Sequence, residues 1–162
     1  MTKLSKSNRY QQHDRKTNLS IIGWRETIAL PQLGISQIKA KIDTGARSSA
    51  LHAFHIKKFE RDRKQMVRFE VHPRQRDNKT TVTTEAEILE YREVRNSGGM
   101  AQLRPVILTK VQLGEKIWEI ELTLTNRDVM GFRMLLGRQG IRNKFLVDPG
   151  KSFLQSRHDR EQ

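Results

Sequence analysis

A single acidic residue, Asp43, stands at the end of an alternating segment and is followed by Thr44 and Gly45. In residues 38–42, Ile and Ala alternate with Lys, which is typical of a half-buried strand that would carry the Asp43 carboxylate to the edge of an apolar layer. Thr44 can form local hydrogen bonds, and Gly45 lets the backbone turn tightly beside the carboxylate. Such a carboxylate can do acid–base chemistry, although Asp, Thr and Gly are also ordinary turn residues.

A second motif favours the catalytic interpretation. Residues 134–138 read Met-Leu-Leu-Gly-Arg, an apolar run closed by Gly137 and Arg138. This run is similar to the segment that packs behind the catalytic loop in retropepsin-like aspartic proteases, whose loop reads Asp-Thr-Gly-Ala. We therefore expect Leu136, Gly137 and Arg138 to support the loop that carries Asp43.

The similarity extends over roughly residues 20–149 in five spaced blocks. The blocks are residues 23–26, 30–35, 40–53, 126–130 and 133–138. Together they resemble the bacterial family labelled ATP-dependent zinc protease, which is also described as retropepsin-like. The resemblance implies an aspartic-type peptidase with an all-β fold, a retropepsin-like closed barrel that supplies one lobe per chain.

The composition fits one domain. The chain has 162 residues and no Cys, a length usual for a single domain. Without Cys there is no disulfide framework, no thiolate nucleophile and no Cys-based zinc site. The sequence has no apolar stretch of about 18 residues, which a membrane span would need, and its polar N-terminus does not resemble a secretory signal. We expect a soluble, cytoplasmic protein with no membrane partner.

The formal net charge is +13, and most of the excess lies in the body of the chain rather than at its ends. Such a field favours acidic peptides or nucleic acid, and weak non-specific binding of nucleic acid is expected at low salt. A solvated basic surface is an equally good interpretation of this charge.

Turn residues and alternating segments divide the chain into an expected disordered basic arm (1–19), a peptidase domain (20–150) and a flexible C-terminal tail (151–162). Within the domain, short strands and frequent turns predict an all-β barrel. Strands are expected at 36–42, at 66–71 and as a pair within 80–91, a hairpin turn at 113–116, and a short helix at 139–144.

The strongest turn signal is Asn96-Ser97-Gly98-Gly99, which predicts a hairpin between the two motifs. A retropepsin has its flap in this position, and such a cover excludes water and positions the peptide. Gly98 and Gly99 are therefore expected to contact substrate. The turn-like segment 75–79 is the alternative flap tip.

Peptide hydrolysis by carboxylates needs two of them around one water molecule: one takes a proton from the water, and the other polarises the scissile carbonyl. Two carboxyl groups this close share one proton. The chain contains only one Asp-Thr-Gly, so the enzyme would be a homodimer whose two-fold axis passes between two copies of Asp43.

The loop residues have further expected roles. Ala46 would keep the floor of the site small, and Arg47 occupies the place where many viral relatives have an acidic substrate-binding residue. Because Arg grips carboxylates in a fork, we expect a preference for acidic peptides. The alternative is that Arg47 pairs internally with Asp128 or Glu26.

The sequence gives little support for the zinc site and the ATP binding that the family label names. His52 and His55 are three residues apart, which places them on opposite faces of a strand, and His72 is distant. No metal and no cofactor are therefore expected. Gly150-Lys151-Ser152 lacks the upstream Gly of a phosphate loop, so ATP would be used by a partner; the resemblance implies an ATP-grasp glutamate ligase.

Two other functions stay open at this point. One is a catalytically silent dimeric β-module that binds nucleic acid or an acidic protein. The other is a zinc-dependent hydrolase.

Overall fold

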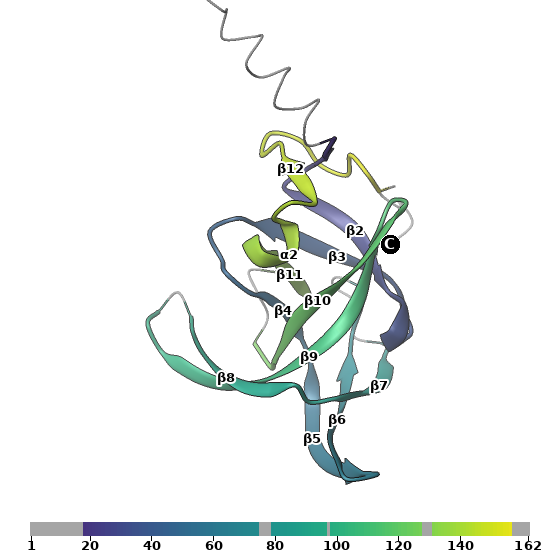
Figure 1. The fold of residues 1–162 in the computed structure, drawn as a ribbon, viewed down its shortest axis with the longest axis vertical. Coiled ribbons are helices and arrows are strands. Elements are labelled where there is room, and N and C mark those ends of the chain that lie inside the picture. The colour runs from purple at the N-terminus through teal and green to yellow at the C-terminus, as the bar shows by residue number, and fades with distance from the viewer. Residues whose placement is uncertain (1–17, 75–78, 97, 128–130, 157–162) are drawn as a thin grey trace, which may run out of the picture.

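The computed structural model describes residues 18–74, 79–96, 98–127 and 131–156, and almost all of the regular structure is β (Figure 1). The strands are β1 (Ser20–Ile22), β2 (Arg25–Leu30), β3 (Ile35–Asp43), β4 (Ser49–His52), β5 (Phe54–Arg61), β6 (Lys64–Val71), β7 (Val82–Glu87), β8 (Glu90–Arg95), β9 (Ala101–Leu113), β10 (Lys116–Thr125), β11 (Met134–Gly137) and β12 (Phe145–Val147). The described residues also form the short helices η1 (Pro31–Leu33) and α2 (Arg138–Ile141).

The main sheet closes into a barrel, as expected for a retropepsin-like lobe. Its strands follow the order β10-β4-β11-β3-β2-β9, and β9 also pairs with β10, which joins the two ends. Closure leaves no free edge within this ring of strands. The all-β, closed-barrel prediction is therefore confirmed.

Alternation of apolar and polar residues explains why these segments form barrel strands. In β3 the buried positions include Ile38, Ala40 and Ile42, with the lysines between them more exposed. In β10 the buried Trp118, Ile120 and Leu122 alternate with exposed residues in the same way. The strands predicted at 36–42 and 66–71 are thus present as β3 and β6, and each is two residues longer than predicted.

Strand β9 is long enough to serve two parts of the molecule. Residues 106–113 pair with β10 in the barrel wall, and residues 101–106 pair with β8 outside it. The two strands β8 and β9 form an arm that curves away from the barrel (Figure 1). The hairpins predicted at Asn96–Gly99 and at Leu113–Lys116 are both confirmed, with positive φ at Gly99 and Gly114.

A second sheet, β5-β6-β7, projects from the end of the barrel opposite β12 (Figure 1). Its inner face adds Val67, Phe69 and Val71 to the hydrophobic core. The alternative flap tip at 75–79 follows β6, and residues 75–78 lie outside the described part of the chain.

The segment that follows β12 packs against the barrel. The amide of Trp24 donates a hydrogen bond to the carbonyl of Lys151 (2.8 Å), and the amide of Phe153 donates to that of Arg25 (3.0 Å). We call residues 151–156 the C-terminal strap. The expectation of a flexible tail from residue 151 is wrong for these residues, because the strap hydrogen-bonds to β2 and to the residues before it. Residues 1–17 of the expected arm and 157–162 of the expected tail lie outside the described residues.

Glu26 holds this strap. It is fully buried, and its Oε2 accepts hydrogen bonds from the amides of Gly23 (3.0 Å) and Leu154 (2.8 Å). Its Oε1 accepts from the amide of Gln155 (2.8 Å) and the hydroxyl of Ser156 (3.0 Å). Four donors around one carboxylate satisfy a buried acidic group without a cation.

None of the helices in the described part of the chain has the length and apolar character that crossing a membrane requires.

Substitution Glu26→Gln tests the strap. The amide group can present only one acceptor oxygen, so two of the four donors would face an NH₂ group. We expect the free energy of unfolding to fall by about 1–3 kcal/mol in urea titrations. The matched control is Glu115→Gln in the exposed β9–β10 turn, which should change it by less than about 0.5 kcal/mol. Equal stability of both variants would contradict the role assigned to Glu26.

Candidate active site

The Asp43 loop is organised by the carboxylate itself. Asp43 ends β3, and its Oδ1 accepts hydrogen bonds from the amides of Gly45 (3.0 Å) and Ala46 (3.1 Å). This local turn is the one that the Asp-Thr-Gly pattern favours. No described residue donates a hydrogen bond to the other carboxylate oxygen, Oδ2, so that oxygen is left for a reactant.

Strand β11 supports the loop from behind. It pairs in parallel with β3 so that Gly137 lies beside Asp43 and Leu136 beside Ile42. A Cβ atom on Gly137 would lie 2.4 Å from the carbonyl oxygen of Ser48, closer than any real contact. Only Gly fits at this position. The Gly137 amide is in turn bound by the hydroxyl of Ser49 (3.0 Å).

The residues after Gly137 hold the far side of the loop. The amide of Arg138 donates to the carbonyl of Ala46 (2.7 Å), and that of Gln139 donates to the carbonyl of Arg47 (3.1 Å). The guanidinium of Arg138 donates to the carbonyl of Thr44 (3.0 Å). Gly137 and Arg138 thus contact the loop, whereas Leu136 pairs with Ile42 of β3, the residue before Asp43.

A cavity of about 560 Å³ lies between the Asp43 loop and the β8–β9 arm; we call it the inner cavity. Its lining comes from the loop, the arm, and the ends of β4, β10 and β11. The residues are Asp43, Gly45, Ala46, Arg47, Ser48, Ala50, Val94, Arg95, Asn96, Gly98, Arg104, Thr125, Arg127 and Leu135.

Five of the ten predicted site residues line this cavity. Asp43, Gly45, Ala46 and Arg47 line it from the loop, and Gly98 lines it from the hairpin tip. The exposed Thr44 and the turn residue Gly99 are not part of the lining.

The charge of the inner cavity is unbalanced. Four arginines, Arg47, Arg95, Arg104 and Arg127, line it, and Asp43 is the one carboxylate among the described lining residues. Burial, and next to it the positive charge of Arg127, lower the pKa of the Arg104 guanidinium. The cavity is therefore suited to an anionic ligand.

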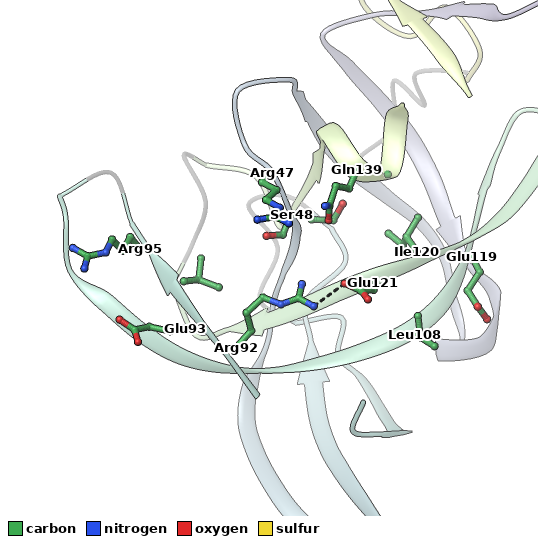
Figure 2. Close-up of a pocket in the computed structure, with 13 residues that line it drawn as sticks. Arg47, Ser48, Arg92, Glu93, Arg95, Leu108, Glu119, Ile120, Glu121 and Gln139 are labelled. Atoms are coloured by element: carbon green, nitrogen blue, oxygen red, sulfur yellow. Dashed lines mark hydrogen bonds and ion pairs between the residues drawn. The ribbon is translucent and has the colours of Figure 1, made fainter. Parts of the chain in front are cut away.

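A second cavity, of about 760 Å³, shares the lining residues Arg47, Ser48, Val94 and Arg95 with the inner cavity. Figure 2 shows its lining. We call it the outer cavity. Its lining contains the three arginines Arg47, Arg92 and Arg95 and the three carboxylates Glu93, Glu119 and Glu121. Its lining charges are therefore balanced, and it does not contain Asp43.

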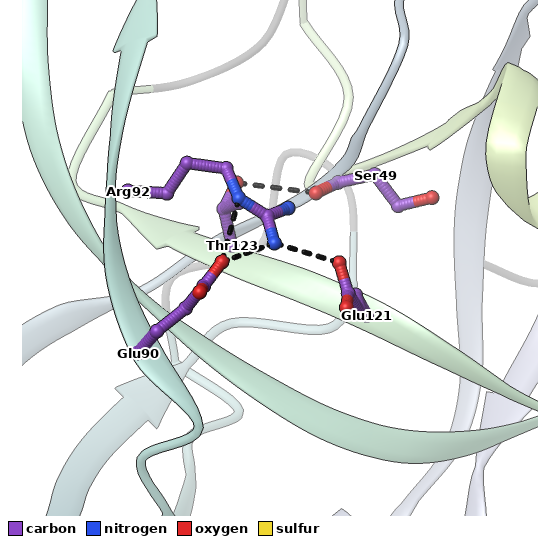
Figure 3. A network of polar contacts seen from close by, with 5 residues as sticks. All are labelled: Ser49, Glu90, Arg92, Glu121 and Thr123. Carbon is purple, nitrogen blue, oxygen red and sulfur yellow. Dashed lines mark hydrogen bonds and ion pairs between the residues drawn. The ribbon is translucent and has the colours of Figure 1, made fainter.

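Arg92 ties the arm to the barrel. Its guanidinium donates to Glu121 of β10 (2.8 Å) and contacts Glu90 of its own strand (Figure 3). These hydrogen bonds, first to Glu121 and then to Glu90, raise the pKa of Arg92. Beneath them the hydroxyl of Thr123 donates to the carbonyl of Ser49 (3.1 Å), which joins β10 to β4. The base of the arm is thus fixed to the barrel wall.

His52 and His55, the two histidines considered as zinc ligands, have separate partners in the structure. A ring nitrogen of His52 lies 3.2 Å from the guanidinium of Arg133. His55 belongs to the second sheet, where it contacts Glu70. Among the described residues, no group of three or more His, Cys, Asp or Glu side chains is placed to hold a metal ion. No step of a reaction is therefore assigned to zinc.

The cavity residues that sequence reasoning missed include Arg95 and Arg104, and it misjudged one pairing. Arg95 and Arg104 lie in charged strands, where nothing in the sequence separates them from surface residues. Glu26 is wrong as a partner for Arg47, since Glu26 is buried under the strap and bound by four donors. Asp128, the other partner considered, lies outside the described residues.

Comparison with known proteins now identifies the family. The model of the RimB-like family, described as the retropepsin-like aspartic endopeptidase RimB, matches residues 21–158. The chain belongs to the RimB-like family. The resemblance to retropepsin-like aspartic proteases is thereby confirmed.

The chain is also similar to curated proteins and to a solved structure. The chain is 48% identical over 136 residues to a probable alpha-L-glutamate ligase of Shewanella pealeana, and 50% identical over 133 residues to one of Parasynechococcus marenigrum. The matches cover 84% and 82% of this chain but only 30% and 28% of those proteins. A crystal structure of a Legionella pneumophila protein of unknown function matches with a TM-score of 0.68 and 31% identity, covering 84% of this chain and 98% of that one.

The lack of room at Gly137 leads to a prediction for this RimB-like fold. Substitution Gly137→Ala would push the β11 backbone away from the loop, so we expect unfolding to become easier by about 1–3 kcal/mol in denaturant titrations. The matched control is Gly150→Ala, because a Cβ there has ordinary contacts and no positive φ. A Gly137→Ala protein as stable as the control would show that the loop does not depend on this close approach.

Proposed function

We propose that this protein is an aspartic endopeptidase that acts as a homodimer, with Asp43 of each subunit as the catalytic acid or base. The observation that carries the proposal is the placement of Asp43 on the floor of the inner cavity, opposite the hairpin tip, in a chain of the RimB-like family. The retropepsin-like family model supports a hydrolase.

The dimer follows from the number of carboxylates. Peptide hydrolysis by this chemistry needs two, and each chain offers one Asp-Thr-Gly loop. An isologous contact brings identical loops together, so the partner supplies the second Asp43. Thr44 is exposed at the tip of the loop, where its hydroxyl can link the two copies.

In the proposed reaction the two Asp43 carboxyl groups share one proton. The ionised group removes a proton from a water molecule, whose oxygen attacks the scissile carbonyl carbon, while the protonated group donates its proton to the carbonyl oxygen. The resulting tetrahedral diol collapses as its C–N bond breaks: the leaving nitrogen takes the proton held by the pair, and a hydroxyl of the diol gives its proton to the other carboxylate. The pair then again holds one proton.

We further propose that the substrate is an acidic peptide. Arg47, Arg95, Arg104 and Arg127 give the inner cavity a positive field that attracts carboxylates. The names of the relatives point in the same direction, because a glutamate ligase produces chains that contain glutamate. An ATP-grasp glutamate ligase as functional partner agrees with the positive field of the cavity and with the names of the relatives. Nucleic acid would be bound only non-specifically.

Substitution Asp43→Asn tests the catalytic role. Asn cannot act as the base, so kcat for a cleaved peptide should fall by about 10²–10⁴-fold. Folding should persist, as judged by circular dichroism.

Two controls separate this mechanism from the alternatives. In a dimer with one Asp43 from each subunit, adding excess Asp43→Asn protein should abolish wild-type activity, because mixed dimers lack one carboxylate. Activity should survive EDTA, whereas a zinc hydrolase would lose it. An Asp43→Asn protein that still cleaves would overturn the proposal, and a protein that cleaves nothing but binds acidic protein would be the silent module.

Peptide libraries test the charge preference. Glu-rich peptides should be cleaved with a kcat/KM about tenfold or more above that of Lys-rich peptides, and added salt should narrow the difference, since it screens charges. Cleavage is measured by mass spectrometry at low and high salt. Equal rates for both libraries would rule out an acidic substrate while leaving the Asp43 chemistry intact.

A further inference from the structure

Arg104 stands out as a buried cation at the inner cavity. Its residue is only 8% exposed, and it lies on β9 directly opposite Arg92 of β8. Two like charges in opposite positions repel each other. Arg92 is neutralised by Glu90 and Glu121, whereas no carboxylate of the described residues forms an ion pair with Arg104.

A hydrogen-bond network fixes Arg104 in place. Its Nε donates to the Oε1 of Gln102 (3.1 Å), which also accepts from the hydroxyl of Thr125 (3.3 Å). The Thr125 oxygen in turn accepts from the amide of Arg127 (3.2 Å). The network links Arg104 of β9 to the backbone of Arg127, which follows the end of β10, and both residues line the inner cavity. The two terminal guanidinium nitrogens of Arg104 make no hydrogen bond to another described residue.

A buried charge without a counter-ion is costly, and replacing it with an apolar group is often neutral or stabilising. A negatively charged ligand would supply the missing counter-ion. A guanidinium with free terminal nitrogens matches a carboxylate in a two-pronged hydrogen bond.

We propose that Arg104, assisted by Arg127, is the specificity-determining residue that binds a side-chain carboxylate of the substrate inside the inner cavity. The inference rests on the proposed peptidase function and assigns its acidic preference to one position. Arg104 acts on the bound peptide and takes no part in the proton transfers at Asp43.

The test uses the full chain carrying Asp43→Asn, so that peptides are bound but not cleaved. The probes are acetylated and amidated tetraglutamate and tetraglutamine, with affinities measured by calorimetry. Arg104→Met should weaken tetraglutamate binding by about tenfold or more and leave tetraglutamine binding unchanged. Arg104→Lys keeps the charge but cannot form the two-pronged hydrogen bond. Its affinity for tetraglutamate should therefore lie between those of the parent protein and of Arg104→Met.

The matched control is Arg61→Met, which removes the same charge from the exposed end of the second sheet. It should change tetraglutamate affinity by less than about twofold, since the screened long-range field is weak. Tetraglutamine with a free C-terminus separates the two sources of carboxylate. If Arg104 matters only for that peptide, the residue binds a chain end and the side-chain assignment is wrong.

Thermal unfolding of the same variants gives a second readout. Arg104→Met should have a Tm equal to or above that of its parent, because an unpaired buried charge is removed. A marked fall in Tm would show an internal structural partner and overturn the inference. Should wild-type protein cleave by Asp43 while Arg104→Met keeps full discrimination between Glu and Gln, only the inference fails; loss of Asp43-dependent cleavage would instead remove the proposed function.

Discussion

The parallel pairing of β3 with β11 is the contact on which the site depends. It brings Gly137 beside Asp43 at a distance that tolerates no side chain, and it lets the backbone after Gly137 bind the carbonyls of the loop. The loop therefore has few free backbone groups, although it lies at the surface. Because the loop backbone holds it, the Asp43 carboxylate keeps its position without support from another side chain. Preorganised acid–base chemistry requires a group fixed in position in this way.

The strands and turns around this contact could be predicted from local patterns, because alternation in β3 and Gly-rich turns encode them in adjacent residues. Strand β5 could not, since its residues are mostly polar and partly exposed on both faces. The burial of Glu26 was also out of reach. Three of its four hydrogen-bond donors are more than 120 positions away in the chain, and no local sequence pattern indicates such a contact.

The same limit explains why the candidate site was only half predictable. Asp43 and Arg47 are adjacent to a recognisable motif, whereas Arg104 is one of many basic residues in a chain of charge +13. What distinguishes Arg104 is its burial and the lack of a carboxylate among its described neighbours. Both depend on how the β8–β9 arm folds over the loop, and neither is visible in composition or periodicity.

The arm also separates the arginines of the cavity by how firmly they are held. Arg92 ties the base of β8 to β10, and Arg104 lies opposite it on β9. Arg95 is next to the hairpin tip, where the turn residues hydrogen-bond to one another; for example, the amide of Gly99 donates to the carbonyl of Asn96 (3.0 Å). Opening of the tip to admit a peptide would displace Arg95 and leave Arg104 in place. A carboxylate bound at the fixed base would then position the peptide before the tip closes over it.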